Sequence, residues 1–280
     1  MNLGSFVKQL KGELEQFLEG REIENHLRIL LDYYLDIDRA NQTLRAKEEV
    51  PEEKMKAMMG AVDELKTGKP IDYILNESVF WGFPFYVDEN VLIPRPETEE
   101  LVLLILDHEQ EKNISILDIG TGSGIIPIAL KFDRQDYQVE ACDISVPALK
   151  VAERNAKALK TDIKFFELDF LTSLPGKKYD VVVSNPPYVK EEELKMLDGK
   201  VREFEPIIAL TPFGDPLMFY KRMVATVGDI LKPRGRFYWE VHEDFGQEAM
   251  ALLKPGPFEE VELYEDMYGR SRLIRALYTG

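Results

Sequence analysis

The stretch Asp118-Ile119-Gly120-Thr121-Gly122-Ser123-Gly124 decides the fold of this chain. It ends a short apolar segment, residues 114–119, that has the length of a buried strand. Three glycines at alternate positions let the backbone turn tightly and come close to a ligand. A helix that starts after such a turn aims free N–H groups at that ligand. The residues predicted to bind it are Asp118, Gly120, Thr121, Gly122, Ser123 and Gly124.

Two common nucleotide-binding loops fit this stretch poorly. A dinucleotide fingerprint would place its third glycine, or an alanine, at position 125, where the chain has Ile125. A phosphate-gripping loop needs Gly-Lys followed by Ser or Thr, and the stretch has no lysine. A glycine turn with a purely structural role remains an alternative at this point.

Apolar segments and helical patterns alternate through the rest of the chain. This alternation predicts an α/β domain with a mostly parallel, seven-stranded sheet covered by helices on both faces, a Rossmann-like arrangement. In such sheets ligands bind beyond the carboxyl ends of the strands. The expected strands are residues 114–119, 137–142, 163–167, 179–184, 236–241, 258–263 and 271–277, and the expected helices 96–108, 146–159 and 217–231.

Acidic residues follow the second and third of these strands. Asp143 stands where a carboxylate can accept hydrogen bonds from both ribose hydroxyls of an adenosine. Asp169 can accept from an adenine amino group, and the ring of Phe170 can cover the purine. The alternative for Asp143 is an acid at a helix start, a role that Ser145 could share. An acidic pocket of this kind suits a sulfonium cation better than a pyrophosphate.

The fourth strand leads into Asn185-Pro186-Pro187-Tyr188. The prolines fix the backbone and remove two N–H donors, so the loop presents acceptors. The Asn185 side-chain oxygen and the Pro186 carbonyl can both accept from one –NH2 group, and Tyr188 offers a ring on which a planar group can stack. Two acceptors can position a weakly nucleophilic amide or amino nitrogen and stabilise the charge that develops on it. The predicted catalytic residues are Asn185, Pro186 and Tyr188, and the predicted substrate-binding residues also include Pro187.

The first seventy or so residues are predicted to form three or four helices. Apolar side chains recur there at three- and four-residue steps, for example from Leu3 to Leu18. Residues 79–93 are aromatic and β-branched, with a turn signal at residues 88–90, and predict a hairpin. The expected domains are therefore residues 1–75, a helical bundle; 76–94, a β-hairpin linker; and 95–280, the α/β domain.

Composition restricts the partners. The chain of 280 residues carries a formal net charge of −16, which disfavours direct binding of nucleic acid. One cysteine and three widely separated histidines predict neither a disulfide nor a zinc site, and no metal is expected. No apolar run approaches the roughly 20 residues of a membrane span. A reducing, cytoplasmic location and a monomer, without a coiled-coil seam, are expected.

The glycine loop, Asp143 and Asp169 together resemble the class I S-adenosylmethionine-dependent methyltransferases. In that superfamily the glycine loop holds the methionine part of the cofactor, the second acid the ribose and the third acid the adenine. The resemblance implies S-adenosyl-L-methionine as cofactor and S-adenosyl-L-homocysteine as product. It also implies that Asn185 borders the cofactor.

Several further segments are similar to the peptide-chain release factor glutamine methyltransferases, the HemK or PrmC family. They are residues 70–75 with Phe80 and Gly82, residues 91–99, residues 204–210, residues 215–220, and Glu240 with Gln247. This resemblance implies N5-methylation of the glutamine in the Gly-Gly-Gln motif of class I release factors. It implies that the helical domain helps to dock the release factor and that residues 95–98 border the methionine end of the cofactor.

The chain departs from the family pattern at Asn76 and Pro216, where the family usually has glycine. Both positions lie outside the predicted transfer site, so they affect local loop shape. Two other functions remain as alternatives: an adenine N6-methyltransferase acting on DNA or RNA, which would share the Asn-Pro-Pro-Tyr motif, and a non-catalytic module that binds S-adenosylmethionine and a partner. For Arg95 and Glu97 the alternative role is a surface ion pair beside a helix start.

Overall fold

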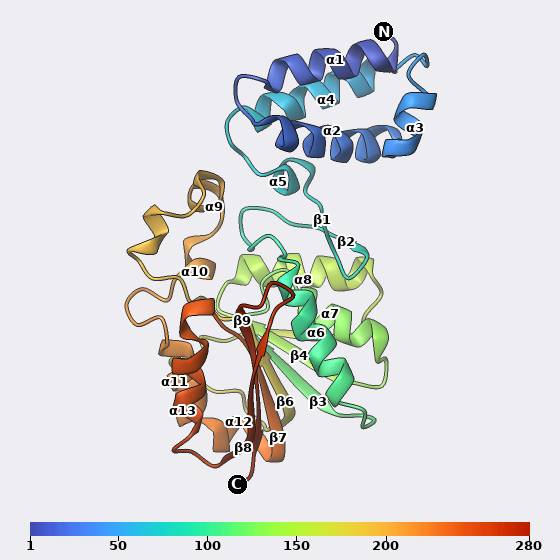
Figure 1. Cartoon of the computed structure of the whole chain (residues 1–280). Helices are drawn as coiled ribbons and strands as arrows, with labels where there is room; N and C mark the ends of the chain where they lie inside the picture. Colours follow the sequence, from blue (N-terminus) through green and yellow to red (C-terminus); the bar gives the residue numbers. More distant parts are fainter. The chain divides into compact units, whose positions relative to one another are not determined.

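The computed structural model describes all 280 residues, which form two compact units (Figure 1). Unit 1 comprises Met1–Asn76 together with Gly199–Phe204, and unit 2 comprises Glu77–Asp198 and Glu205–Gly280. The chain therefore begins in unit 1, continues into unit 2, returns to unit 1 for the six residues Gly199–Phe204, and ends in unit 2. No helix is long and apolar enough to cross a membrane.

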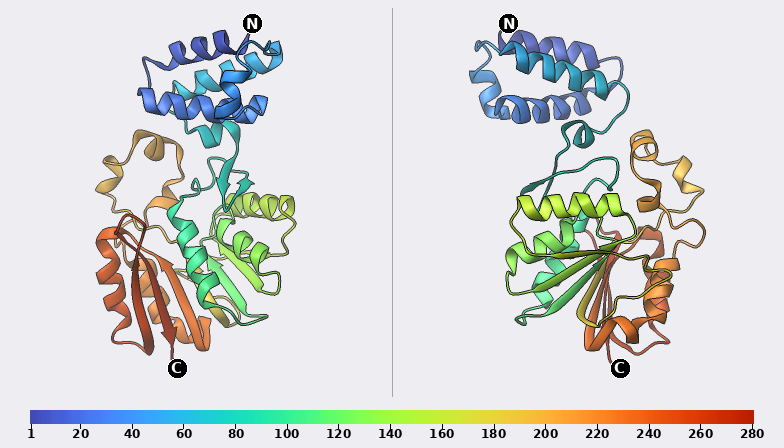
Figure 2. Two further views of the ribbon diagram at one scale, coloured as in Figure 1. Left: turned by 45° about the vertical axis from the view of Figure 1, so that its right-hand side comes forward. Right: turned by 180° about the vertical axis from the view of Figure 1, so that it is seen from behind.

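Unit 1 is built from helices around an apolar core. Its helices are α1 (Leu3–Leu14), α2 (Gly20–Leu35), α3 (Arg39–Leu44), α4 (Glu52–Leu65), α5 (Ile71–Leu75) and α9 (Gly199–Phe204). The helices α1, α2 and α4 contact one another and lie side by side (Figures 1 and 2). Their buried faces carry the side chains that recur at helical steps, among them Leu10, Leu27 and Val62. Burial of these faces stabilises the bundle.

One predicted core residue of unit 1 is exposed. Phe17 continues the apolar spacing of the first helix, but α1 ends at Leu14 and the Phe17 residue is 53% exposed. Because the chain leaves the helical geometry after Leu14, the three- and four-residue spacing no longer places Phe17 on the buried face.

Unit 2 is organised around a seven-stranded sheet. The strand order is β5 (Lys164–Glu167), β4 (Gln138–Asp143), β3 (Ser115–Ile119), β6 (Tyr179–Ser184), β7 (Leu231–Glu240), β9 (Ser271–Tyr278) and β8 (Phe258–Glu265). The first five strands are parallel, and β9 pairs antiparallel with both β7 and β8. The predicted Rossmann-like fold with a mostly parallel, seven-stranded sheet is confirmed.

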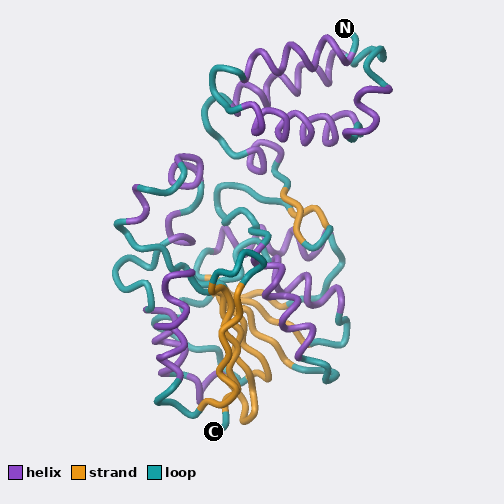
Figure 3. Tube along the Cα trace, viewed as in Figure 1, coloured by secondary structure: helices purple, strands orange, loops and turns teal.

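Helices cover both faces of the sheet (Figures 1 and 3). On one face α6 (Glu97–His108), α7 (Ile125–Asp133) and α8 (Val146–Ala158) share an apolar core with β3, β4 and β6. On the other face α11 (Met218–Ala225), α12 (Val227–Ile230) and α13 (Gly246–Leu253) pack against β3, β6 and β7. Alternate residues of β3 serve the two cores: Ile116 belongs to the first and Leu117 to the second. The remaining short helices are η1 (Glu193–Lys195), α10 (Ile207–Leu210) and η2 (Glu243–Phe245).

The predicted hairpin is shorter than expected and turns elsewhere. Strands β1 (Ser78–Phe80) and β2 (Phe83–Phe85) are antiparallel and are joined by Trp81 and Gly82, both with positive φ. The turn predicted at residues 88–90 exists but joins no strands. The wrong turn was favoured because Asp-Glu-Asn is a strong turn signal, whereas Trp81 is an unusual residue for positive φ.

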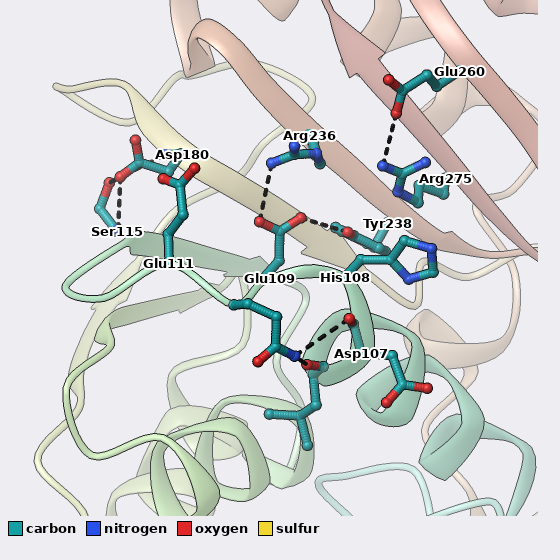
Figure 4. Close-up of polar contacts among 12 residues, drawn as sticks. Asp107, His108, Glu109, Glu111, Ser115, Asp180, Arg236, Tyr238, Glu260 and Arg275 are labelled. Atoms are coloured by element: carbon teal, nitrogen blue, oxygen red, sulfur yellow. Dashed lines mark hydrogen bonds and ion pairs between the residues drawn. The ribbon is translucent and has the colours of Figure 1, made fainter.

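Polar contacts hold the end of the sheet near the starts of β3 and β6 (Figure 4). Glu109, which follows α6 and is buried, accepts hydrogen bonds from the Tyr238 hydroxyl at 2.5 Å and from Arg236 at 3.1 Å. Asp180 at the start of β6 accepts from the Ser115 hydroxyl at 2.6 Å and from Lys232 at 2.8 Å. The Asp180 bonds join β6 to its neighbours β3 and β7, and the Glu109 bonds join the chain after α6 to β7.

Candidate active site

A cavity of about 330 Å³ lies at the carboxyl ends of β3, β4, β5 and β6. Its size falls within the roughly 300 to 1,000 Å³ of small-molecule sites. The register of the sheet explains why these ends meet: Ile119 at the end of β3 pairs with Cys142 of β4 and with Ser184 of β6. The glycine loop and Asn185 therefore leave the sheet side by side, and both line this cavity.

The three glycines of the loop divide into two kinds. All have positive φ, 76° at Gly120, 54° at Gly122 and 81° at Gly124, a conformation that favours glycine. A Cβ at Gly120 or Gly122 would meet no atom within 4 Å, and both glycines line the cavity. A Cβ at Gly124 would lie 3.1 Å from the Ala152 Cβ, and Gly124 is outside the cavity wall. Gly120 and Gly122 leave room for a ligand, whereas Gly124 allows close packing of α7 on α8.

Asp118 is buried beneath the loop and is not part of the cavity wall. Neither of its carboxylate oxygens has a hydrogen-bond partner. Burial raises the pKa of Asp118 from 3.8 to about 7, against the opposing effect of Thr121 and with a smaller contribution from Asp143 in the same direction. A buried, unpartnered carboxylate is costly and is typical of a site in which a ligand supplies the missing partner.

Asp143 ends β4 and lines the cavity. Its two carboxylate oxygens accept from the backbone N–H of Gly122 and of Ser145, each at 2.9 Å. Burial raises the pKa of Asp143, while these backbone donors hold it down. The helix-start role considered from the sequence is fulfilled by Ser145, whose hydroxyl accepts from Ala148 N–H. Each Asp143 oxygen keeps acceptor capacity for a further donor such as a ribose hydroxyl.

Asp169 and Phe170 line the cavity next to Leu168 and Leu171. Asp169 accepts from the Leu171 backbone N–H at 3.0 Å and from the Thr172 hydroxyl at 2.8 Å. Phe170 is buried, and its carbonyl accepts from Arg222 at 3.1 Å. The loop after β5 thus places a carboxylate beside an apolar wall, as an adenine ring would require.

Asn185, Pro186 and Pro187 line the cavity beside the glycine loop. Ser184 anchors the turn, because its hydroxyl donates to the Ile119 carbonyl at 2.7 Å. The Asn185 side-chain nitrogen donates to the Thr98 hydroxyl oxygen at 3.3 Å. The amide group of Asn185 is therefore held on one side by α6.

Tyr188 is placed behind this wall and does not line the cavity. Its hydroxyl donates to Glu240 at 3.2 Å, and its ring centroid lies 5.6 Å from that of His242. Burial, followed by the charge of Glu240, raises the pKa of Tyr188 well above its usual range. The predicted stacking of a substrate on Tyr188 is therefore not supported by this arrangement, in which the tyrosine braces the loop.

Glu240, at the end of β7, joins two of these groups. It is 1% exposed and accepts from the Thr98 hydroxyl at 2.8 Å as well as from Tyr188. Burial raises the pKa of Glu240, whereas the Thr98 hydroxyl, the Arg272 guanidinium and the Tyr188 hydroxyl lower it. The sequence signalled Thr98 and Glu240 only as family motif residues, because neither lies near Asn185 in the chain.

Two wall segments received no role from the residue patterns alone. Residues 90–95 form one side, and Arg95 at its end pairs with the buried Glu205 at 2.7 Å. The predicted surface alternative for Arg95 is thus replaced by an ion pair at the cavity. Ile208, Ala209 and residues 211–213 form the other side. Ile208 and Phe213 are apolar and about half exposed. Their exposure is a property of the structure, so the sequence offered no signal for this segment.

The architecture is that of the methyltransferase fold. A family model described as methyltransferase small domain matches residues 98–204. The crystal structure of a methyltransferase from Pyrococcus furiosus superposes with a TM-score of 0.52 at 13% identity, over 82% of this chain and 100% of that one. The fold and these matches place the chain among the methyltransferases.

Relatives along the whole chain identify the family. A release factor glutamine methyltransferase of Flavobacterium psychrophilum is 37% identical over 98% of this chain and 99% of the relative. One from Bacillus subtilis is 38% identical over 92% of each chain. A second family model, PrmC N-terminal domain, matches residues 9–75. The chain belongs to the release factor glutamine methyltransferase family.

Proposed function

We propose that this chain transfers a methyl group from S-adenosylmethionine to the N5 side-chain nitrogen of the glutamine in the Gly-Gly-Gln motif of class I peptide-chain release factors. The observation that carries the proposal is that Asn185 and Pro186 share a cavity wall with Gly120 and Gly122. The two hydrogen-bond acceptors proposed to bind the substrate amide thus lie beside the space for the methyl donor. The full-length relatives support the choice of release factors as substrate.

The cavity residues fit the proposed cofactor. The open space at Gly120 and Gly122 would accommodate its amino acid part, and Asp143 would accept from its ribose hydroxyls. Asp169 and Phe170 receive the adenine. Asp118 places a buried carboxyl group without a partner under the glycine loop, and a cationic ligand would favour its ionised form. When bound, S-adenosylmethionine supplies a methyl group on a positively charged sulfur.

The residues around Asn185 explain how a poor nucleophile reacts. The lone pair of an amide nitrogen is delocalised, and the Asn185 oxygen and Pro186 carbonyl orient that nitrogen by accepting from its two hydrogens. The N–C bond forms as the S–C bond breaks, and the electron pair of the broken bond stays on sulfur. The nitrogen then loses one proton to water. The two acceptors stabilise the positive charge on the nitrogen before that loss.

We propose that residues 1–75 dock the release factor, that residues 76–94 link them to the transfer domain, and that residues 95–280 bind the cofactor and catalyse transfer. The protein then acts as a monomer on a protein substrate in the cytoplasm. The acidic net charge of −16 disfavours nucleic acid as the substrate.

The test is incubation of the protein with S-adenosylmethionine and a purified bacterial release factor, followed by mass spectrometry of the Gly-Gly-Gln peptide. A gain of one methylene mass on the glutamine is expected. Asn185→Ala should lower the transfer rate by at least about 100-fold, with a smaller change in cofactor affinity, because it removes one preorganised polar group.

The matched control is Gln110→Ala, which removes a carboxamide from an exposed position after α6. It should transfer at the unaltered rate. Methylation of an adenine-containing oligonucleotide in place of the release factor would overturn the proposed substrate. Undiminished transfer by Asn185→Ala would overturn the catalytic assignment and favour a non-catalytic binding module.

A further inference from the structure

The Asn185 side chain has two chemically different ends, and the proposed function, on which this inference rests, requires one of them to face the substrate. An amide substrate presents N–H donors, so it needs the Asn185 oxygen. The –NH2 end of Asn185 would repel the same donors. An exposed asparagine can rotate its amide and present either end, so the transfer site needs a device that holds one orientation.

A chain of hydrogen bonds runs from Asn185 into the interior of unit 2. The Asn185 Nδ2 donates to Thr98 Oγ1 at 3.3 Å, and Thr98 Oγ1 donates to Glu240 Oε2 at 2.8 Å. The second oxygen of Glu240 accepts from the Tyr188 hydroxyl at 3.2 Å. Thr98 and Glu240 are each 1% exposed, so water does not compete for the hydrogen bond between them.

The direction of this chain follows from the chemistry of its last member. The Thr98 hydroxyl, the Arg272 guanidinium and the Tyr188 hydroxyl favour the ionised form of Glu240 against the effect of burial. In that form the carboxylate accepts hydrogen bonds and donates none, so the single proton of the Thr98 hydroxyl is committed to Glu240. Thr98 then offers only lone pairs to Asn185. The –NH2 end of Asn185 must face Thr98, and its oxygen must face away. If the Asn185 amide rotated by half a turn, its oxygen would face the lone pairs of the Thr98 hydroxyl, and the hydrogen bond between the two side chains would be lost.

The three groups come from separate, rigid parts of the unit. Thr98 lies in the first turn of α6, Glu240 ends β7, and Asn185 follows β6. Thr98 and Asn185 both line the cavity, whereas Glu240 lies behind it. Glu240 is held from a further side, because its backbone carbonyl accepts from the buried Tyr220 hydroxyl at 2.9 Å. Groups locked by their own packing in this way can orient a reacting side chain.

We propose that Thr98 and Glu240 are positioning residues that hold the carboxamide of Asn185 with its oxygen toward the substrate. They make the site select a group that donates hydrogen bonds, an amide –NH2, over a group that only accepts them, such as a carboxylate. Selection of glutamine over glutamate in the release factor follows from this orientation.

The first test uses Thr98→Val, which removes the hydroxyl and keeps the shape. The transfer rate at saturating cofactor is expected to fall about tenfold or more, the scale of one lost hydrogen bond, while cofactor affinity stays nearly constant. Thr98→Ser, which restores the hydroxyl, should recover most of the rate. Glu240→Gln should give an intermediate loss, because its amide can donate to Thr98 and so permits both orientations.

The second readout separates orientation from simple structural damage. Binding is compared for a release factor with the natural glutamine and for the same protein with that glutamine replaced by glutamate. The unaltered enzyme should prefer glutamine, and Thr98→Val should reduce this preference by about tenfold, since Asn185 can then turn its –NH2 toward the carboxylate. A general loosening of the site would instead weaken both affinities alike, with their ratio unchanged, and would overturn the proposal.

The matched control is Thr161→Val, which removes a hydroxyl whose bond to the Ala156 carbonyl is long, 3.4 Å, outside the transfer site. It should change neither rate nor preference. The side-chain amide resonances of Asn185 give a readout without catalysis: protection of its –NH2 protons should be lost in Thr98→Val and kept in Thr98→Ser. If the unaltered protein methylates no release factor, the proposed function fails, but the protection of the –NH2 protons still reports the orientation of the Asn185 amide. Equal protection in the unaltered protein, in Thr98→Val and in Thr98→Ser would overturn the positioning role of Thr98.

Discussion

The two ends of the parallel strands in unit 2 both bury acidic side chains but give them different partners. Near the starts of β3 and β6, Glu109 is bound by the Arg236 guanidinium and the Tyr238 hydroxyl. At the carboxyl ends, the oxygens of Asp118 have no partner, and the carboxylate of Glu240 accepts hydrogen bonds from the neutral hydroxyls of Thr98 and Tyr188. At the strand starts, the Glu109 carboxylate joins two parts of the chain through charged and polar partners. At the carboxyl ends, carboxylate oxygens remain able to accept further hydrogen bonds. An unpaired buried charge is affordable where a ligand completes it.

Asp118→Asn tests the unpaired end and has the largest expected effect. The Asp118 pKa is raised from 3.8 to about 7 in the folded protein. As pH rises through this window the unfolded chain releases its proton while the folded protein keeps it, so stability falls and then levels off above about pH 7. Asparagine carries no such penalty. In urea unfolding the variant should therefore gain up to roughly 4 kcal/mol at about pH 8 and nothing near pH 4, while its affinity for S-adenosylmethionine falls.

Asp180→Asn is the matched control at the opposite end. Burial opposes ionisation of Asp180, but its bonds to Lys232 and Ser115 prevail and lower its pKa. Its ionised form therefore contributes stability above the unfolded pKa, and the variant should lose stability at about pH 8. If both variants shifted stability in the same direction, the contrast between the two ends would be wrong.

Glu109→Gln tests the paired end. The change leaves the half-buried Arg236 guanidinium without its anionic partner, and it should cost up to about 3 kcal/mol in the free energy of unfolding. The methyl-transfer rate of the folded protein should stay constant, because neither Glu109 nor its partners Arg236 and Tyr238 line the cavity. Urea unfolding and transfer assays on the same sample check both statements. A large loss of rate without a loss of stability would contradict the structural role.

The two kinds of glycine in the loop provide the smallest and most local test. Gly124→Ala places a Cβ 3.1 Å from the Ala152 Cβ at a positive φ, and should destabilise the protein by about 2 kcal/mol. Gly122→Ala points a Cβ into open space, so it should cost only about 1 kcal/mol but weaken cofactor binding by about tenfold or more. Thermal unfolding and cofactor titration separate the two outcomes. Equal loss of cofactor affinity in both variants would show that Gly122 and Gly124 do not have separate roles in ligand binding and helix packing.

Much of unit 2 was predictable because its strands are short, apolar and bounded by turns. The strand at Tyr179–Ser184 and the helix starting at Val146 have the predicted limits or nearly so. The hairpin was harder, because three-residue strands carry little pattern and a tryptophan with positive φ gives no turn signal. Propensity fails there because packing of Phe80 and Phe85 in the core decides the turn.

The predicted site residues differ in how visible their roles were. The glycine loop, Asp143 and Asp169 follow strands directly, so their place at the sheet edge could be derived from the order of elements. Tyr188 stands one residue beyond the cavity wall and faces Glu240, a direction that the order of elements does not specify. The cavity wall formed by residues 211–213 depends on how a long connection folds back, which local patterns do not encode.

The sequence by itself determined the class of fold, the edge of the sheet where ligands bind and the chemical types of the binding groups, because alternation of strands and helices constrains topology. Only the tertiary structure decided which polar groups meet. Thr98 and Glu240 are 142 positions apart, and Asn185 is 87 from Thr98. Contacts between such distant residues arise from the packing of whole elements, and the direction of each hydrogen bond depends on all the neighbours at once.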